Sequence, residues 1–508
     1  MISPRAYSIE PVIPSPRGAS LVDMLPLCAL AWGALAFGAV YAWAYWPLAA
    51  LCVMSGIAGV IVARRSNGTG RAFARGLEGT SPALRYTLIA VAVAILVQLL
   101  PMPGGVVAQL SPRSAALVRQ LNPAFAAGLE PFHPMSVWPR DTWIALALYA
   151  SLAALLVGTA HLFSVTGSRR FVEALTAFGA VLALIGFVQK SLSSRYLYGF
   201  WELEIGRTPF GPFVNRNHFA GWMVMALPLA LALLVAGLDQ SMQKLKTGWR
   251  YRVLWFASPE ANRLILVAAA ALLMALSLML TMSRSGIVAF GFSMLITGWF
   301  VARSVRSRSR RLAAAVCLAL LLAIALLWTG PDVVAGRVAA ANWGEFNNRK
   351  GAWVDAWSVA RDFPLAGTGL NTYWAAALFY QHHEMAYFFA QTHNDYLQLA
   401  AEGGLLLMVP ALVCLVVFVR DVRHAMHDTR AETTAWLRAG AVTSLIAIAF
   451  QETVEFSLQM PGNAALFAVV CAIALHRPPE NLFGEDDGAP ARVRGRLLRI
   501  VRGQRTAR

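Results

Sequence analysis

Long apolar runs, separated by shorter polar segments, recur along most of the chain. Many approach the roughly 20 residues that a helix needs to cross a bilayer. Strands would leave backbone groups unpaired in lipid unless they closed into a barrel, and the alternation typical of strands is absent. The pattern predicts an all-α, polytopic integral membrane protein with about 12 transmembrane helices. The runs cover residues 24–44, 47–63, 84–100, 142–164, 171–190, 219–237, 263–282, 286–302, 312–328, 398–419, 438–456 and 460–475.

Basic residues are concentrated in the polar segments on one side of this predicted bundle. Arginine and lysine groups follow the second, fourth, sixth, eighth and tenth runs, and the segment from Arg492 onward is rich in arginine. With twelve spans, all of these groups and both termini fall on the same side, which the positive-inside rule makes the cytoplasm. Topology and contact with anionic membrane lipids therefore explain the net charge of +17, and we expect no nucleic-acid partner.

The same pattern divides the chain into five parts. A cytoplasmic tail (1–23) precedes nine transmembrane helices (24–328), and a long extracytoplasmic loop (329–397) follows them. Three further transmembrane helices (398–475) lead to a basic cytoplasmic tail (476–508). Loops longer than about 15 residues are usually functional or disordered. We therefore look for chemistry in the 329–397 loop first.

The 329–397 loop is dense in Trp, Tyr and Phe, which argues against disorder. Within residues 348–361, Ala352, Trp353, Ala356 and Trp357 recur at helical spacing. This spacing predicts a short helix in the loop. Such a helix either lies at the membrane interface, where indoles are favoured, or packs on the end of the bundle.

A first polar cluster precedes the sixth apolar run. Asn215, Arg216, Asn217 and His218 combine amide, guanidinium and imidazole groups where a helix is predicted to begin. A helix N-terminus beside a guanidinium favours anions such as phosphate, so all four residues are candidate substrate contacts. The alternative is structural: Asn215 caps the helix, and Arg216 extends to lipid headgroups.

A second cluster lies at the tight turn between the seventh and eighth runs. Ser283, Ser285 and Gly286 suit a helical hairpin turn, although both serines are also candidate substrate contacts. Arg284 has apolar runs on both sides and almost no loop to lift it into water. An arginine near the membrane edge is costly, so we interpret Arg284 as a functional residue.

The third cluster closes the 329–397 loop. His393 is a candidate general base, because an unperturbed imidazole titrates near pH 6.5 and suits proton transfer. Asn394 and Asp395 follow it and are candidate substrate contacts. Asp395 or Glu402 could orient the imidazole, provided that the fold brings them close.

Two further groups of polar residues have weaker functional signals. Gln381-His-His-Glu384 resembles a metal site only superficially, because neighbouring histidines point in different directions and no further ligand spacing supports zinc. We therefore expect no metal and no cofactor. Glu452 and Glu455, near the outer end of the eleventh run, either balance the arginines or form a structural ion pair.

Together the three clusters suggest a reaction class. A lipid-linked pyrophosphate leaving group needs fixed cations, because negative charge builds on it in the transition state. An incoming sugar hydroxyl needs a base, and sugar rings stack on aromatic side chains such as those in the 329–397 loop. Glycosyl transfer at the outer membrane edge would use all of these groups.

At these clusters the chain resembles the O-antigen ligase and O-antigen polymerase superfamily, which are bacterial membrane glycosyltransferases. The matching stretches run from Asn215 to Ala220, from Thr281 to Gly286, from Pro364 to Leu370 and from Thr392 to Leu397. No single stretch is specific, but their order is. The resemblance covers roughly residues 200–420.

The resemblance implies a GT-C-like helical fold in the bacterial inner membrane, with the active site facing the periplasm. The donor would be an undecaprenyl-pyrophosphate-linked glycan, and transfer would be inverting and independent of metal. The essential arginines of the family would correspond to Arg216 and Arg284, which hold the pyrophosphate. Arg207 is a nearby competitor for the first position. The essential histidine would be His393, which activates the acceptor hydroxyl.

The acceptor remains open, because these motifs are shared within the superfamily. A ligase passes the glycan to the lipid A core, a polymerase passes it to another lipid-linked repeat unit for O-antigen or exopolysaccharide, and some relatives glycosylate protein. We rank ligase-type transfer first and polymerase second. A polysaccharide or lipid transporter or flippase is the alternative from another class. It is disfavoured because no internal repeat is seen and the polar residues gather at one face.

Overall fold

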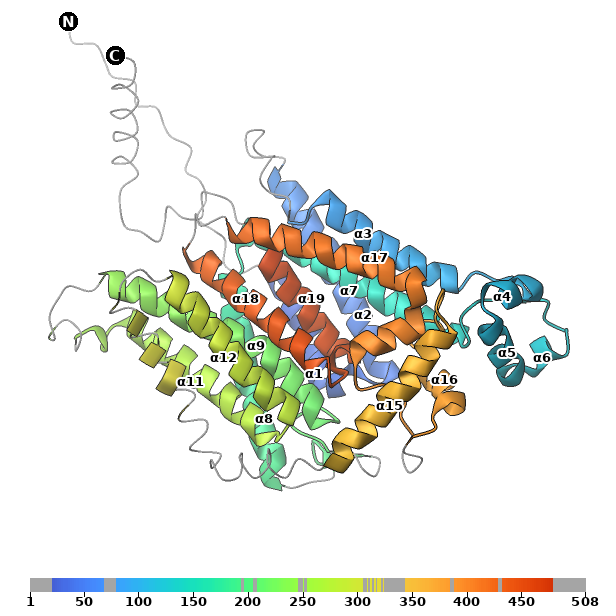
Figure 1. Ribbon diagram of the computed structural model, residues 1–508. Helices are drawn as coiled ribbons and strands as arrows, with labels where there is room; N and C mark the ends of the chain where they lie inside the picture. Colours follow the sequence, from blue (N-terminus) through green and yellow to red (C-terminus); the bar gives the residue numbers. More distant parts are fainter. Residues whose placement is uncertain are drawn as a thin grey trace, which may run out of the picture.

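The computed structural model is a bundle of long helices with a smaller group of helices at one end (Figure 1). It describes residues 21–67, 79–192, 196–203, 208–244, 254–304, 343–383, 388–427 and 432–477, together with scattered residues between 250 and 323. Most of both predicted tails and more than half of the predicted ninth span (312–328) lie outside the described residues. So do Arg207, Glu384 and the beginning of the 329–397 loop.

Eleven of the twelve predicted spans are helices in the described part of the chain. Eight are long and apolar enough to cross a membrane, and three apolar ones are shorter. The long helices are α2 (Ala42–Asn67), α7 (Pro139–Thr166), α8 (Arg169–Leu192), α9 (Arg216–Lys244), α11 (Pro259–Leu280), α12 (Arg284–Ser304), α17 (Asp395–Met426) and α18 (Glu432–Gln451). The shorter ones are α1 (Leu21–Leu35), α3 (Pro82–Gln98) and α19 (Pro461–Leu475). The chain is a polytopic membrane protein; the total of twelve spans stays a prediction.

Helix α9 forms the centre of the bundle. Every residue from His218 to Ala236 is buried, and α8, α11, α12, α18 and α19 all pack against it. A helix that is apolar on all sides is buried either in lipid or among other helices, and α9 is covered by other helices. The position of its first residue, Arg216, at one end of the bundle is therefore fixed. The same end carries the polar clusters.

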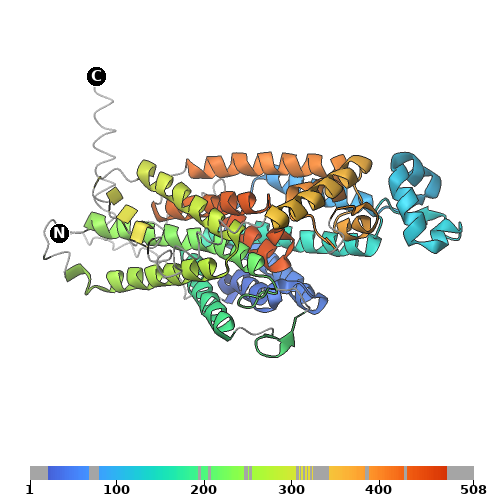
Figure 2. The same cartoon turned by 60° about the horizontal axis from the view of Figure 1, so that its bottom comes forward.

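Short helices and strands lie at the end of the bundle that carries the polar clusters. Figure 2 shows α4 (Gly104–Leu110), α5 (Pro112–Leu121) and α6 (Pro123–Ala126) beyond the end of the bundle. Two 3₁₀ turns, η1 (Phe37–Ala39) and η2 (Ser457–Gln459), are also present. The predicted all-α class holds apart from two short antiparallel ladders. These pair β1 (Met102–Pro103) with β2 (Phe132–His133), and β3 (Tyr196–Leu197) with β4 (Trp201–Glu202).

The helix predicted over 348–361 is confirmed and is longer, as α15 (Trp343–Asp362). Its buried face contains Ala352, Ala356 and Val359, and α15 packs against α17 and α16 (Tyr373–Tyr380). On the other side of α15, the Trp357 side chain is 61% exposed. The structure thus shows a helix packed on the end of the bundle, which was the second of the two interpretations.

Helix α17 is broken at Gly404, which has φ 53° and ψ −163°. The preceding loop fills the break. Backbone N–H groups of Thr368 and Gly369 donate to the carbonyls of Ala401 and Glu402, and those of Leu405 and Leu406 donate to Pro364 and Leu365. A Cβ on Gly404 would lie 2.6 Å from the nitrogen of Gly367, so the close approach requires glycine. The Gly367-Thr-Gly369 segment therefore completes the helix.

One basic residue assigned to topology has a different role. Arg438 is only 1% exposed, and its guanidinium donates to the carbonyls of Ala425 and His476. These carbonyls end α17 and α19, whose last carbonyl groups lack helical partners. Arg438 therefore ties two helix ends together at the predicted cytoplasmic side.

Candidate functional site

The three polar clusters meet at one end of the bundle. Helices α9, α12 and α17 begin there, at Arg216, Arg284 and Asp395, and α18 ends there at Gln451. The turn that follows α18 carries Glu455, which is 1% exposed. This carboxylate contacts residues from all three clusters.

Glu455 accepts three hydrogen bonds at Oε1. The donors are Asn217 Nδ2 at 2.9 Å, Arg349 Nη2 at 3.0 Å and Ser285 Oγ at 3.4 Å. Its other oxygen, Oε2, lies 3.8 Å from His393 Nδ1. We call Asn217, Ser285, Arg349, His393 and Glu455 the Glu455 cluster. It joins the beginnings of α9 and α12, helix α15 and the residue that precedes the cap of α17.

The charge of Glu455 is maintained by its neighbours. Burial alone would raise the pKa of this carboxyl, but the adjacent His393 imidazole and the positive charge of Arg349 outweigh burial and lower the pKa below its usual range. Arg349 also donates to the carbonyl of Val454 at 2.8 Å, which fixes the turn that carries Glu455. The site thus contains an ionised carboxylate directed at an imidazole.

The backbone and aromatic rings hold His393. It has φ 53°, a left-handed conformation that non-glycine residues seldom adopt and that is often found at functional sites. Its ring lies edge-on to Phe456 at 4.7 Å, and the ring of His218 lies edge-on to the same Phe456 at 4.9 Å. Phe389 approaches His393 at 6.0 Å. Its side chain remains 23% exposed, so the imidazole is both restrained and accessible.

Local turns place the other contacts. Asn215 caps α9, because its Oδ1 accepts the N–H of Asn217 at 2.9 Å. Met282, with φ 53°, turns the chain between α11 and α12, and Ser283 Oγ lies 3.2 Å from Ser285 Oγ. Asn394 caps α17 by accepting the N–H of Leu397 at 3.0 Å. These residues stabilise the turns and helix ends, and these turns place Asn217 and Ser285 within hydrogen-bonding distance of Glu455.

The comparison with protein families finds a match over part of the chain. Residues 269–412 match the O-antigen ligase family model. The resemblance inferred from the motifs is therefore confirmed over this segment, which contains Arg284, Arg349 and His393. A search of curated proteins finds no match to the chain.

The segment that matches this family model begins after Arg216 and ends before Glu455. Arg216 and Arg284 are the first residues of α9 and α12, next to Asn217 and Ser285 of the Glu455 cluster. The structure thus brings both predicted arginines to the end of the bundle where His393 lies. It also adds Arg349, which the sequence interpretation missed, although Arg349 lies within the helix that it predicted.

Asp395 and Glu402, the two carboxylates predicted as possible orienting groups for His393, have other partners. In the described part of the chain, neither Asp395 nor Glu402 contacts His393. Asp395 accepts from Gln459 Nε2 at 2.6 Å, whereas Glu402 accepts the backbone N–H groups of Asn371 and Tyr373 at 2.7 and 2.9 Å. Both belong to α17, and their hydrogen bonds go to residues other than His393. Glu455, noted only as a possible ion-pair partner, takes this position.

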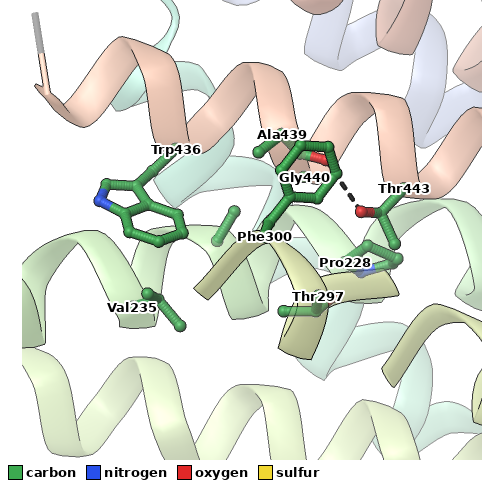
Figure 3. A pocket seen from close by; sticks show the side chains of 9 residues that line it. Pro228, Val235, Thr297, Phe300, Trp436, Ala439, Gly440 and Thr443 are labelled. Atoms are coloured by element: carbon green, nitrogen blue, oxygen red, sulfur yellow. Dashed lines mark hydrogen bonds between the residues drawn. The ribbon is translucent and has the colours of Figure 1, made fainter. Parts of the chain in front are cut away.

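Two further observations concern described residues outside the Glu455 cluster. No group of metal ligands is found among the described residues; His383 instead contacts Asp355. A small apolar pocket lies between α9, α12 and α18, lined in part by Phe300 and Trp436 (Figure 3). Thr443, which donates to the carbonyl of Ala439, is one of its few polar residues. None of the described residues that line this pocket carries a charge or a side chain that titrates near neutral pH.

Proposed function

We propose that this protein is an O-antigen ligase-like glycosyltransferase of the bacterial inner membrane. It moves a glycan from undecaprenyl pyrophosphate to an acceptor hydroxyl, on the lipid A core or a similar glycan, at the periplasmic face. The convergence of all three motifs on Glu455 carries this proposal, and the family match over residues 269–412 supports its class. The predicted topology, with both termini cytoplasmic, places the site on the periplasmic side.

In the proposed reaction, His393 accepts the proton of the acceptor hydroxyl. The hydroxyl oxygen attacks the anomeric carbon as the bond from that carbon to the phosphate oxygen breaks, and the bonding pair leaves with the pyrophosphate. A direct attack of this kind inverts the anomeric configuration. Glu455, 3.8 Å from His393, stabilises the imidazolium that forms, as the carboxylate does in other histidine-based sites.

The arginines have two separate roles in this proposal. Arg349 holds Glu455 through a 3.0 Å ion pair and therefore positions the base indirectly. Arg284 and Arg216, at the beginnings of two helices, bind the pyrophosphate, where helix N-termini add favourable partial charge. Fixed cations of this kind stabilise the leaving group without a metal, within a GT-C-like helical fold.

The test is transfer by the purified full-length protein. Lipid-linked glycan is supplied with and without lipid A core, and the product is identified. A product on lipid A core indicates ligase activity, whereas elongated lipid-linked glycan indicates polymerase activity. Arg284→Ala and His393→Ala should abolish transfer in protein that is still inserted in the membrane. Normal products from either variant would refute the assigned site.

A further inference from the structure

A second imidazole–carboxylate pair lies outside the Glu455 cluster. Asp355, on α15, is 3% exposed, and its Oδ1 lies 2.7 Å from His383 Nδ1. Its Oδ2 accepts the backbone N–H groups of His382 and His383, both at 3.2 Å. The His383 side chain is 52% exposed. A buried carboxylate thus orients an accessible imidazole.

This geometry fixes how the His383 ring is presented. A carboxylate accepts hydrogen bonds and donates none, so Nδ1 of His383 carries the proton of the 2.7 Å bond. In the neutral ring, Nε2 then has a free lone pair. That nitrogen can accept a hydrogen bond from a hydroxyl group, which is the group that sugars offer most often.

His383 lies near the Glu455 cluster. A Cβ on Gly351 would be 2.6 Å from His383 Cβ, and Gly351 is two residues from Arg349 on the same helix. Asp355 is six residues from Arg349, or about 9 Å along a helix axis. Gln381 Oε1 accepts the N–H of Phe389 at 3.0 Å, and Phe389 in turn approaches the His393 ring. His383 and His393 therefore belong to the same part of the outer surface.

Anchoring of the 381–383 segment does not by itself account for the pair. The two backbone bonds to Asp355 Oδ2 already fix the chain, whereas the bond to Nδ1 adds only an orientation of the ring. Without that bond, the imidazole could rotate in solvent. An oriented ring with an outward-facing acceptor atom is what recognition of a hydroxyl requires.

We propose that His383 binds the acceptor glycan. Its Nε2 accepts a hydrogen bond from a sugar hydroxyl of the acceptor, on a ring next to the one whose hydroxyl reacts at His393. Asp355 is a positioning residue that fixes the His383 tautomer. This inference rests on the proposed function and adds an acceptor subsite to it.

Two substitutions at His383 separate recognition from anchoring. In His383→Asn, the amide nitrogen takes the place of Nδ1 and can still donate to Asp355, but Nε2 is removed. In His383→Gln, the longer side chain brings an amide oxygen close to the former Nε2 position. His382→Asn is the matched control, since His382 contacts Asp355 through its backbone N–H. All three are compared with wild type as full-length purified protein.

The measurement is steady-state transfer with each substrate varied while the other is saturating. The donor probe is lipid-linked glycan, and the acceptor probe is whichever of lipid A core or lipid-linked glycan the wild type elongates. For His383→Asn we expect the acceptor KM to rise about five- to tenfold, the size expected for one lost hydrogen bond. The donor KM should not change. His383→Gln should recover part of the loss, and His382→Asn should resemble wild type.

Two results would overturn the inference. One is an acceptor KM for His383→Asn within twofold of wild type. The other is an equal rise of donor and acceptor KM together with a lower melting temperature, which would show that the pair only anchors the loop. A wild-type protein that transfers no glycan would instead refute the proposed function, and the acceptor subsite would fall with it. The two failures are therefore distinguishable.

Discussion

Replacing Glu455 by glutamine tests the proposed base directly. The amide oxygen can occupy the position of Oε1 and keep the hydrogen bonds from Asn217, Ser285 and Arg349. The amide nitrogen then faces His393 in place of the negatively charged Oε2. The substitution therefore removes one charge from the site and leaves most of its contacts in place.

The separation of the two groups gives the size of the effect. Opposite unit charges 3.8 Å apart attract by about 4 kcal/mol at an effective dielectric constant near 20, and by about 1 kcal/mol if water screens them fully. Because the His393 side chain is 23% exposed, the contribution lies between these limits. Each 1.4 kcal/mol or so is a factor of ten in rate, so Glu455→Gln should lower kcat by about 10²-fold.

The assay is glycan transfer by purified Glu455→Gln protein at saturating donor and acceptor. Glu130→Gln is the matched control, because Glu130 is an exposed residue of the loop after α6 that contacts Asn122. Its kcat should equal that of wild type. If Glu455→Gln keeps kcat within threefold of wild type, the carboxylate does not stabilise an imidazolium at His393 and this part of the mechanism is wrong.

Other substitutions test the surrounding structure. Arg349→Gln should lower transfer about 10²-fold and reduce the melting temperature, since it leaves the buried Glu455 charge without its ion pair; a wild-type melting curve would contradict this. Burial, together with the charge of Asp395, raises the pKa of Glu452 well above the usual carboxyl value. The folded protein therefore keeps a proton on Glu452 that the unfolded chain loses, and the stability of the fold falls as pH rises above the usual carboxyl value. Glu452→Gln should therefore raise the melting temperature at pH 8 more than at pH 5, and equal shifts would argue against a protonated Glu452. Gly404→Ala should destabilise the protein by about 2 kcal/mol or more, because a Cβ would strike Gly367; denaturant titration measures it. Reporter fusions within the 329–397 loop should be active in the periplasm, and cytoplasmic activity would overturn the topology.

The spans could be predicted from the sequence because burial in lipid depends on the local composition of each segment. Apart from the break in α17, each apolar run that forms a helix contains its own backbone hydrogen bonds, so it can be predicted without knowing its neighbours in space. The caps at Asn215 and Asn394 are local as well, since each accepts an N–H within three residues. The three motifs were therefore recognisable as features of helix ends.

The contacts within the site could not be predicted in this way. Asn217 and Glu455, which share a hydrogen bond, are 238 residues apart in the chain. Arg349 lies in a polar stretch beside Lys350, where a single arginine is typical of a solvated helix face. Asp395 and Glu402 were chosen as orienting groups because they are close to His393 in sequence. In the folded protein Asp395 binds Gln459 and Glu402 binds the backbone of Asn371. The turn after α18 brings Glu455 to the imidazole instead.

The break in α17 also constrains how the protein is made. The N–H groups of Leu405 and Leu406 find their acceptors in Pro364 and Leu365, which belong to a loop outside the helix. An unpaired backbone group in the hydrocarbon layer costs several kcal/mol, so α17 is an incomplete membrane helix until that loop docks. Residues 364 and 365 leave the ribosome before α17, so under the predicted topology these acceptors cross the membrane before the helix inserts. We therefore expect a circular permutant that places α17 ahead of the loop to insert poorly.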